Sequence, residues 1–572
     1  MSLLLTSFLK IFFNFYFIYL TLYFFGRLFF LLINYLNFKS WTLKDNYFYT
    51  KTSIFYPIAG YFFLGNLLLI LNYFVPLKSL PVLYFLIFVI LFNFKSFNIK
   101  FLKLKKYITV NHFVNFIFIP SVFLVSSFDI SFHYDAGFYH LNHQNWIRES
   151  NLVIGLVNIF WPYGIGSLSE YVSSIFWQDK SLINLHYFQI IFLSTFFNFI
   201  YFHLIENKTT YFKYPSFLIV IFALLDNFGF AGGRNGFIYI QEIGKQDLQV
   251  SILVIFVGLF CISSILFNKY DIPEISLILA FSLLAIQLKL SSIFLGILIL
   301  IYLYQFSIHK RFKFFHFIKI NSISLFFSFA WLLKNTLTSG CLFFPVNSTC
   351  LNNYDWYRKG STKYIEDYTS MTSFGFQSYF KDKELNVTDW FFDFFYNNGV
   401  FSEFYKSYYL NFIASIFLII LFKFIFAEKV KLEISKVIYI NLFFLISVFY
   451  LILYGPIPRY SSGILTLLVS VLGFNIINLK HKYIKSAIPF LFVLSLLLIP
   501  RLNSYKSAWY NQSIALPDPR FEWNYTERKL NDIWVSPIET DMCWINQFCT
   551  SEVGGKIFIE NSFFKVVNRE LE

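Results

Sequence analysis

The sequence predicts an all-α polytopic membrane protein, a bundle of about 13–14 transmembrane helices connected by several large extracytoplasmic loops. Its 572 residues are 57% hydrophobic and 14% charged, whereas a soluble domain carries about 25% charged residues. Apolar runs long enough to cross a bilayer, about 18 residues or more, recur along the chain. Lys and Arg gather in the short connections between these runs, which is typical of membrane proteins.

About fourteen apolar segments can be marked along the chain. They cover residues 5–30, 54–73, 80–95, 108–127, 181–204, 215–231, 248–268, 274–289, 291–307, 318–335, 410–426, 435–454, 461–479 and 486–500. The first segment is ambiguous, because apolar character continues to Leu36 with Arg27 inside it, so an interfacial helix could follow the first span. No small-residue cleavage site follows it, so it does not read as a removed signal peptide.

Four loops rich in Lys and Arg predict the orientation, because such loops stay in the cytoplasm. Alternation through the segments places all four on one side: Lys95, Lys100, Lys103, Lys105 and Lys106; Lys310, Arg311, Lys313 and Lys319; Lys423, Lys429, Lys431 and Lys436; Lys480, Lys482 and Lys485. The net charge of +14 therefore belongs to these loops. We expect a lipid bilayer as partner and no nucleic acid.

This layout divides the chain into six regions. Transmembrane helices are expected in residues 1–127, 181–335 and 410–500, and extracytoplasmic pieces in residues 128–180 with juxtamembrane helices, 336–409 and the tail 501–572. With the C-terminal tail outside, an even number of spans places the N-terminus outside as well. If the first apolar segment were divided in two, the N-terminus would lie on the other side.

Cysteine positions agree with the layout. Cys261 falls inside a predicted span and should be a free, buried thiol. Cys341 lies close to Cys350, and Cys543 lies close to Cys549, both in pieces assigned to the outside. Since oxidation is possible there, we expect two disulfides.

The densest polar cluster follows the fourth apolar segment, and comprises Asp129, His133, Asp135, Tyr139, His140, His143 and Trp146. If residues 135–149 are helical, Asp135, Tyr139, His143 and Trp146 share one face. A partly desolvated carboxylate there is suited to take a proton from a sugar hydroxyl. The histidines could tune it or help to hold a divalent metal, although their spacing is no metal signature. The alternative is a solvated loop that anchors the helix at the headgroups.

Two further features border the same outer face. Residues 151–166 contain glycines and Pro162 and predict a loop that returns to the membrane surface, which we interpret as scaffolding. Cations near the bilayer could bind the phosphate of a lipid carrier or could snorkel to headgroups. These cations are Lys289, Arg234, Lys334 and Arg459, and Asp226, Glu242 and Asp247 are weaker candidates nearby.

Several strings resemble a family of bacterial multi-pass membrane proteins encoded among lipopolysaccharide and surface-glycan genes, with a GT-C-like fold. They are His133-Tyr-Asp135-Ala-Gly-Phe-Tyr139-His140, Trp146-Ile-Arg-Glu-Ser-Asn-Leu-Val-Ile-Gly155-Leu-Val-Asn158, Ser339-Gly-Cys341-Leu-Phe-Phe-Pro345, Pro456-Ile-Pro458-Arg459-Tyr460 and Cys543-Trp-Ile-Asn-Gln-Phe-Cys549. The resemblance extends over most of the chain from about residue 54 onward.

The resemblance implies a GT-C-type glycosyltransferase of the bacterial inner membrane, with its active site facing the periplasm or exterior. Such enzymes take a sugar from a polyprenyl-phosphate-type donor and pass it to a surface glycan or lipid acceptor. The essential acid corresponds to Asp135, with Asp129 as second candidate and His140 or His133 orienting it. Substrate contacts are expected from Tyr139, His143, Lys289, Arg459 and Arg234.

This chain departs from the GT-C pattern in one respect, because Asp129 and Asp135 are six residues apart and form no close acidic pair. A divalent metal therefore stays possible, with unknown ligands. Two alternatives share the substrate class, a glycan repeat-unit polymerase and a flippase or exporter of lipid-linked sugars. No internal repeat of the kind that transporters show is evident. A purely structural membrane scaffold is the remaining alternative.

Overall fold

The computed structural model describes thirteen longer stretches of the chain and short pieces of its tail. These are residues 2–38, 53–80, parts of 83–91, 110–177, 182–206, 211–228, 240–270, 272–309, 314–358, 361–373, 400–429, 432–454 and 458–511, followed by 529–530, 533–535, 542–545, 549–550, 552, 556–561 and 565–570.

The structure is mostly helical, and this confirms the predicted class of multi-pass membrane protein. Within the described stretches, nine helical segments are long and apolar enough to cross a membrane: Leu4–Asn37, Ser53–Asn72, Val110–Phe128, Asn184–Glu206, Asp247–Phe267, Leu290–His309, Phe314–Ser339, Tyr408–Phe426 and Ile434–Leu453. A tenth is possible where α20 (Lys482–Leu498) and α21 (Arg501–Asn511) meet at a bend of 61°.

The number of spans is lower than the 13–14 expected. Helices α10 (Lys213–Phe228), α12 (Ile272–Leu288) and α19 (Pro458–Val471) have 16, 17 and 14 residues. At 1.5 Å per residue, such helices fall short of a hydrocarbon core about 30 Å thick. Apolar composition alone does not separate a short buried helix from a span. The expected segment at 80–95 falls largely outside the described residues.

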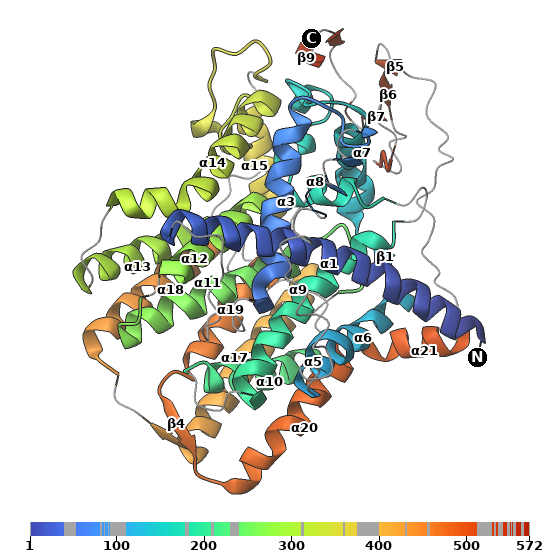
Figure 1. The fold of residues 1–572 in the computed structure, drawn as a ribbon. Helices are drawn as coiled ribbons and strands as arrows, with labels where there is room; N and C mark the ends of the chain where they lie inside the picture. Colours follow the sequence, from blue (N-terminus) through green and yellow to red (C-terminus); the bar gives the residue numbers. More distant parts are fainter. Residues whose placement is uncertain are drawn as a thin grey trace.

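The ambiguous first segment is one continuous helix, α1 (Ser2–Phe38), which runs across the middle of the molecule in Figure 1. It packs against α3 (Tyr56–Asn72) at two glycines. A Cβ atom at Gly26 would lie 1.9 Å from the Tyr56 carbonyl oxygen, and one at Gly60 would lie 1.8 Å from that of Leu22. Small residues at a helix crossing let two backbones approach closely, as is common in membranes.

The centre of the bundle is formed by α9 (Asn184–Tyr201) and α11 (Asp247–Phe267), in whose span windows 94% of residues are buried. Only 22% of the corresponding window is buried in α17 (Val400–Phe426). Its exposed side chains include Leu410, Ile413 and Phe417. A helix with such a large apolar exposed face needs lipid around it, so α17 lies at the periphery of the bundle.

Two of the lysine-rich loops lie side by side. β3 (Ala427–Lys429), which follows α17, pairs antiparallel with β4 (Ile476–Leu479), which precedes α20. The pairing agrees with the prediction that these two loops share one side of the membrane. The loop with Lys95–Lys106 lies outside the described residues. Which compartment this side faces stays a prediction.

Most described parts of the three pieces expected outside the cytoplasm gather at the other end of the molecule, around α7 (Leu141–Glu149) and α8 (Leu168–Ser174) (Figure 1). The first helix of the tail, α21, lies apart from them and packs against η4 (Val125–Phe128). Arg358 forms an ion pair of 2.6 Å with Glu552 of the tail. Ile154 pairs with Val566 in β9 (Lys565–Glu570). The boundaries of the six predicted regions stay predictions, but these contacts join three of them.

All five cysteines are in the predicted state. Disulfides connect Cys341 to Cys350 and Cys543 to Cys549. Cys261 is a buried free thiol within α11. The first disulfide packs with Val157 in a small apolar cluster, so it fastens the second outer piece to the first.

Candidate functional site

A small pocket, with a cavity volume of about 60 Å³, opens where the outer pieces meet the ends of the membrane helices. Its wall has a polar and an apolar part. The lining residues are Asp135, Tyr139, His140, Gly164, Ile165, Gly166, Ser167, Gly244, Lys245, Gln246, Asp247, Ile286, Gln287, Leu288, Lys289, Leu290, Trp331, Asn335 and Phe344. Four of the residues expected at the site from the sequence, Asp135, Tyr139, His140 and Lys289, are among them.

A short parallel strand pair positions Asp135. β1 (Ser131–Phe132) pairs with β2 (Glu242–Ile243), and the amide of His133 donates to the Ile243 carbonyl. The chain then enters a π-helical turn, η5 (Ala136–His140), for which Asp135 is the N-cap residue. The strand pair therefore brings the first outer loop beside the segment that leads into α11, a pairing of residues about a hundred positions apart.

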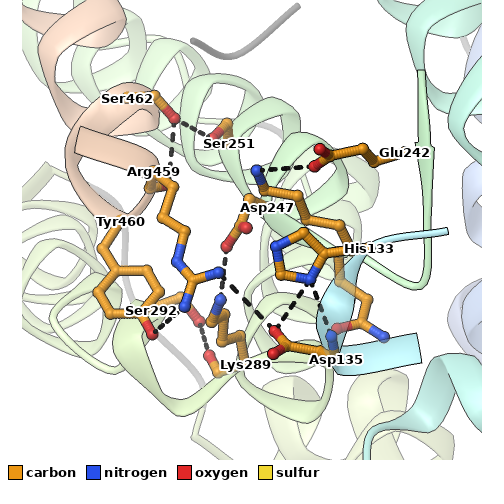
Figure 2. Close-up of polar contacts among 12 residues, drawn as sticks. His133, Asp135, Glu242, Asp247, Ser251, Lys289, Ser292, Arg459, Tyr460 and Ser462 are labelled. Atoms are coloured by element: carbon orange, nitrogen blue, oxygen red, sulfur yellow. Dashed lines mark hydrogen bonds and ion pairs between the residues drawn. The ribbon is translucent and has the colours of Figure 1, made fainter. Parts of the chain in front are cut away.

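Asp135 lies between the imidazole of His133 and the guanidinium of Arg459, as Figure 2 shows. His133 Nδ1 is 3.3 Å from Asp135 Oδ2, and Arg459 Nη1 is 3.7 Å from the same oxygen. Burial by itself would raise the pKa of this carboxyl, but the hydrogen bond and charge of His133 and the charge of Arg459 hold the pKa well below its ordinary value. Asp135 is therefore ionised at neutral pH.

A second ion pair lies beside the first. Lys289 Nζ is 2.5 Å from Asp247 Oδ1 and lies 4.2 Å from the centre of the Tyr460 ring (Figure 2). Lys245 Nζ is 3.5 Å from Glu242 Oε2. Burial lowers the pKa of the Lys245 ammonium, and the nearby carboxylates of Asp247 and Glu242 only partly offset this. The polar wall thus carries several cations, each near a carboxylate.

Glu170 is a central residue of the site that sequence reasoning missed. Its carboxylate is fully buried and accepts from His140 Nδ1 at 2.6 Å and from His143 Nδ1 at 2.5 Å. It also accepts from the amide of Ser167, as part of a capping box at the start of α8. Burial acts to raise the pKa of Glu170, but electrostatic interactions and hydrogen bonds with His143 and His140 lower it to about 2. The Ser167-x-x-Glu170 pattern indicated the start of a helix, but it did not indicate the contacts of Glu170 with His140 and His143.

Lys334 lies behind the pocket wall. It is fully buried near the end of α14 (Phe314–Ser339), and its Nζ donates to the Gly166 carbonyl at 3.0 Å and to Asn335 Oδ1 at 2.9 Å. The snorkelling alternative for Lys334 is therefore wrong. Its charge lies close enough to interact with that of Glu170. The loop at residues 151–166, expected to be scaffolding, contributes Gly164, Ile165 and Gly166 to the pocket wall.

The remaining predicted site residues lie elsewhere. Asp129 follows η4 (Val125–Phe128) as its C-cap and does not line the pocket. His143 is buried against Glu170 and stacks on Tyr163. Arg459 contacts Asp135 without lining the pocket, and Arg234 lies outside the described residues.

The single face expected for Asp135, Tyr139, His143 and Trp146 does not form. The π-helical turn η5 precedes α7 and changes the angular spacing of the side chains. His140 and His143 share one partner, Glu170, and Trp146 belongs to an apolar cluster against which Tyr139 packs. In the described part of the chain, no three His, Cys, Asp or Glu side chains converge as metal ligands.

Comparison with known proteins identifies the family. A family model described as a domain of unknown function (DUF8201) matches residues 8–466. The chain belongs to the DUF8201 family. The matched region contains Asp135, Glu170, Lys289 and Arg459, and it ends before the described tail strands. No curated protein and no solved structure matches the chain significantly.

Proposed function

We propose that this protein is a membrane glycosyltransferase that moves a sugar from a polyprenyl-phosphate-type donor to a surface glycan or lipid acceptor. One observation carries the proposal: the ionised Asp135 faces Arg459 at a pocket that is charged on one side and apolar on the other. A lipid-linked sugar also combines a charged phosphate and a polar sugar with an apolar chain. The residue strings that resemble GT-C-like membrane proteins supply the reaction class, which is an argument by analogy.

The apolar part of the wall supports a lipid-linked donor. Ile286, Leu288 and Leu290 come from the junction between α12 and α13 (Leu295–His309), and Trp331 comes from α14. Because α13 and α14 belong to candidate spans, this part of the wall adjoins helices that contact lipid. A polyprenyl chain could therefore stay in the bilayer while its phosphate reaches the charged wall.

Arg459 is suited to bind the donor phosphate. Its contacts with Asp135 and with the Tyr460 hydroxyl measure 3.7 and 3.4 Å, whereas charge-assisted hydrogen bonds are about 2.7–2.9 Å. The guanidinium loses little by turning towards a phosphate, with which its planar fork can form two hydrogen bonds. Lys289, in contrast, is tightly paired with Asp247 and would act mainly through its charge.

We assign Asp135 the role of general base. It acts after the donor phosphate has bound to Arg459. While Arg459 lies beside it, Asp135 is a weak base because its pKa is low. When the donor phosphate takes the guanidinium, the pKa of Asp135 rises and the carboxylate can accept the proton of the acceptor hydroxyl. The hydroxyl oxygen then bonds to the anomeric carbon, and the carbon–oxygen bond to the phosphate breaks. The polyprenyl phosphate leaves with the electron pair, and Arg459 stabilises its charge.

A deletion strain complemented with variants tests the function. Asp135→Asn should give glycan that lacks one sugar residue, as in the deletion strain, at normal abundance in the membrane. Asp129→Asn is the matched control, since Asp129 does not line the pocket, and it should restore normal glycan. Normal glycan from Asp135→Asn would overturn the assignment of Asp135.

Mass analysis of the same glycans separates the alternatives. A transferase defect removes one sugar from the repeat. Accumulation of single, unpolymerised repeat units would instead identify a polymerase. Complete repeat units held on their carrier in the inner leaflet would identify a flippase, and either result would overturn the proposed transfer.

A further inference from the structure

Two groups of the pocket have hydrogen-bond acceptors without a donor among the described residues. The first is His140, whose Nδ1 is bound to Glu170 while Nε2 has no partner there. The second is Asp247, whose Oδ1 is bound to Lys289 while Oδ2 is buried without a partner. A buried polar atom left without a partner costs about 1–3 kcal/mol. Such atoms are expected to be satisfied by something that enters the pocket.

The partners of these two groups fix them as acceptors. A carboxylate can only accept, so the contact at 2.6 Å requires that His140 Nδ1 carries a proton. In the neutral imidazole, Nε2 is then an unprotonated acceptor. Lys289 binds one oxygen of Asp247 and leaves the other as an acceptor. Asp247 cannot donate from this position, and neither can His140 in its neutral form.

Glu170, which orients His140, is itself held in place by hydrogen bonds. Its second oxygen accepts from His143 and from the Ser167 amide, so the carboxylate cannot rotate without losing these bonds. The nearby charge of Lys334 balances that of Glu170. The charges of Glu170 and Lys334 therefore cancel within this buried cluster, and no charge on an imidazole is needed for balance.

We infer that His140 and Asp247 form a hydroxyl-binding subsite for a polyhydroxylated ligand such as a pyranose, and that Glu170 is a positioning residue that fixes His140 as an acceptor. The subsite deepens the proposed function, on which its biological role rests. Asp135 receives the reacting hydroxyl, and His140 and Asp247 receive others of the same substrate. A site built around acceptors rejects analogues that lack the hydroxyl, because its buried atoms then stay unpaired.

Diethyl pyrocarbonate tests the orientation of His140 without a known substrate, because this reagent acylates unprotonated imidazole nitrogens. The full-length protein in lipid nanodiscs, which carry no sugar headgroups, is treated near neutral pH and analysed by mass spectrometry. His140 should be modified together with the exposed His309 and His481, while the buried His143 and His186 should stay unmodified. Absence of modification at His140 would overturn the inference.

Two variants separate positioning from simple packing. In Glu170→Gln, the amide oxygen keeps the Ser167 and His143 bonds and the amide nitrogen faces His140, so His140 must move its proton to Nε2. Modification of His140 should then slow about tenfold or more, which is about 1.4 kcal/mol. Glu149→Gln is the matched control, because Glu149 is exposed, pairs with Lys78 and does not line the pocket, and it should leave the rate at His140 unchanged. An unchanged rate in Glu170→Gln would show that Glu170 does not set the tautomer. New modification of His186 would reveal misfolding, and the wild-type protein would then carry the test: absence of modification at His140 while His309 is modified would overturn the inference.

Protection by sugars tests the ligand class. The methyl pyranosides of glucose, galactose and mannose, each at high concentration, should include at least one that slows modification of His140. Tetrahydropyran-2-methanol, which has the ring without the ring hydroxyls, should not protect, and Asp247→Asn should remove the protection. Protection by none of the three would overturn the hydroxyl-binding subsite. These results do not depend on glycan transfer, so they distinguish failure of the subsite from failure of the proposed function.

Discussion

Arg459 Nη1 lies 3.7 Å from Asp135 Oδ2, which joins the start of α19 to the start of η5. The contact is close enough to hold Asp135 ionised but too long for a strong hydrogen bond. Because this contact is weak, the Arg459 guanidinium can leave Asp135 for a stronger partner. A phosphate that competes for the guanidinium would change the charge state and the basicity of the carboxylate together.

Substitutions of Arg459 should separate the contribution of its charge to the rate of glycan formation from the contribution of its planar shape. Arg459→Gln should lower the rate of glycan formation by about 10²–10³-fold, because it removes the group that stabilises the leaving phosphate. Arg459→Lys keeps the charge and loses the planar fork, so its rate should lie between those of the wild type and Arg459→Gln. The measurement is the amount of completed glycan per unit of membrane protein over time.

The exposed Lys506 in α21 provides the control for loss of a cation, and Lys506→Gln should retain the wild-type rate. Farnesyl phosphate, a short polyprenyl phosphate, should raise the melting temperature of the wild type because it binds the folded state. It should not raise that of Arg459→Gln. Equal stabilisation of both proteins would contradict a phosphate contact at Arg459.

The low pKa of Asp135 predicts a specific acid sensitivity. A carboxyl whose pKa is lower in the folded than in the unfolded state, where it is about 3.9, adds stability above that pH. This contribution disappears as the pH falls towards the folded-state pKa. Between about pH 6 and about pH 3, the melting temperature of Asp135→Asn should therefore fall less than that of the wild type. A fall equal to that of the wild type would show that Asp135 gains no stability from its neighbours.

The buried Lys334 should be coupled to Glu170. Lys334→Met leaves the Gly166 carbonyl without its donor and the Glu170 charge without its balance, so it should destabilise the protein by about 1–3 kcal/mol. Glu170→Gln removes the charge that Lys334 balances. The double variant should therefore lose less stability than the sum of the two single variants. Unfolding by sodium dodecyl sulfate in mixed micelles provides the measurement.

The solvent-exposed Lys363 in α15 (Thr362–Ser373) is the control for this cycle, and Lys363→Met should leave stability unchanged. Strict additivity of Lys334→Met and Glu170→Gln would argue that their charges do not interact.

The position of the tail segment around Trp544 should depend on Gly137, a glycine in the π-helical turn η5. A Cβ atom at Gly137 would lie 2.9 Å from Trp544 Cε2 and 3.0 Å from Met542 Sδ. Gly137→Ala should therefore displace the loop closed by the Cys543–Cys549 disulfide, since overpacking of this kind costs about 1–3 kcal/mol. Reduction of this disulfide by dithiothreitol, followed by thiol alkylation, should become faster. Gly296→Ala, in α13, meets nothing within 4 Å and should leave the rate unchanged.

Several features of the fold followed directly from the sequence. The long apolar runs predicted α9, α11 and α18 (Ile434–Tyr454), because a helix must satisfy its own backbone in lipid. The cysteine pairs were predicted from their spacing and location. Among the described residues, fewer spans are present than expected, because α10 and α12 are as apolar as spans but shorter and α19 is both shorter and more polar.

The site was only partly predictable. Asp135 and Lys289 stood out because ionisable residues are rare beside apolar segments. Glu170 did not, since a Glu three residues after a Ser is a common helix start. The π-helical turn η5, which no sequence period indicated, changes the spacing between Asp135 and the two histidines. His143 was therefore expected to face the substrate but lies against Tyr163.

The sequence by itself determined the class of protein, the central spans and the disulfides, because these depend on local composition and on spacing along the chain. Only the tertiary structure decided which ions pair. Asp135, Glu170, Lys289 and Arg459 lie on four different elements, and their proximity results from strand pairing and helix packing between segments far apart in the chain. Electrostatic interactions depend on distance in space, which a linear pattern does not specify.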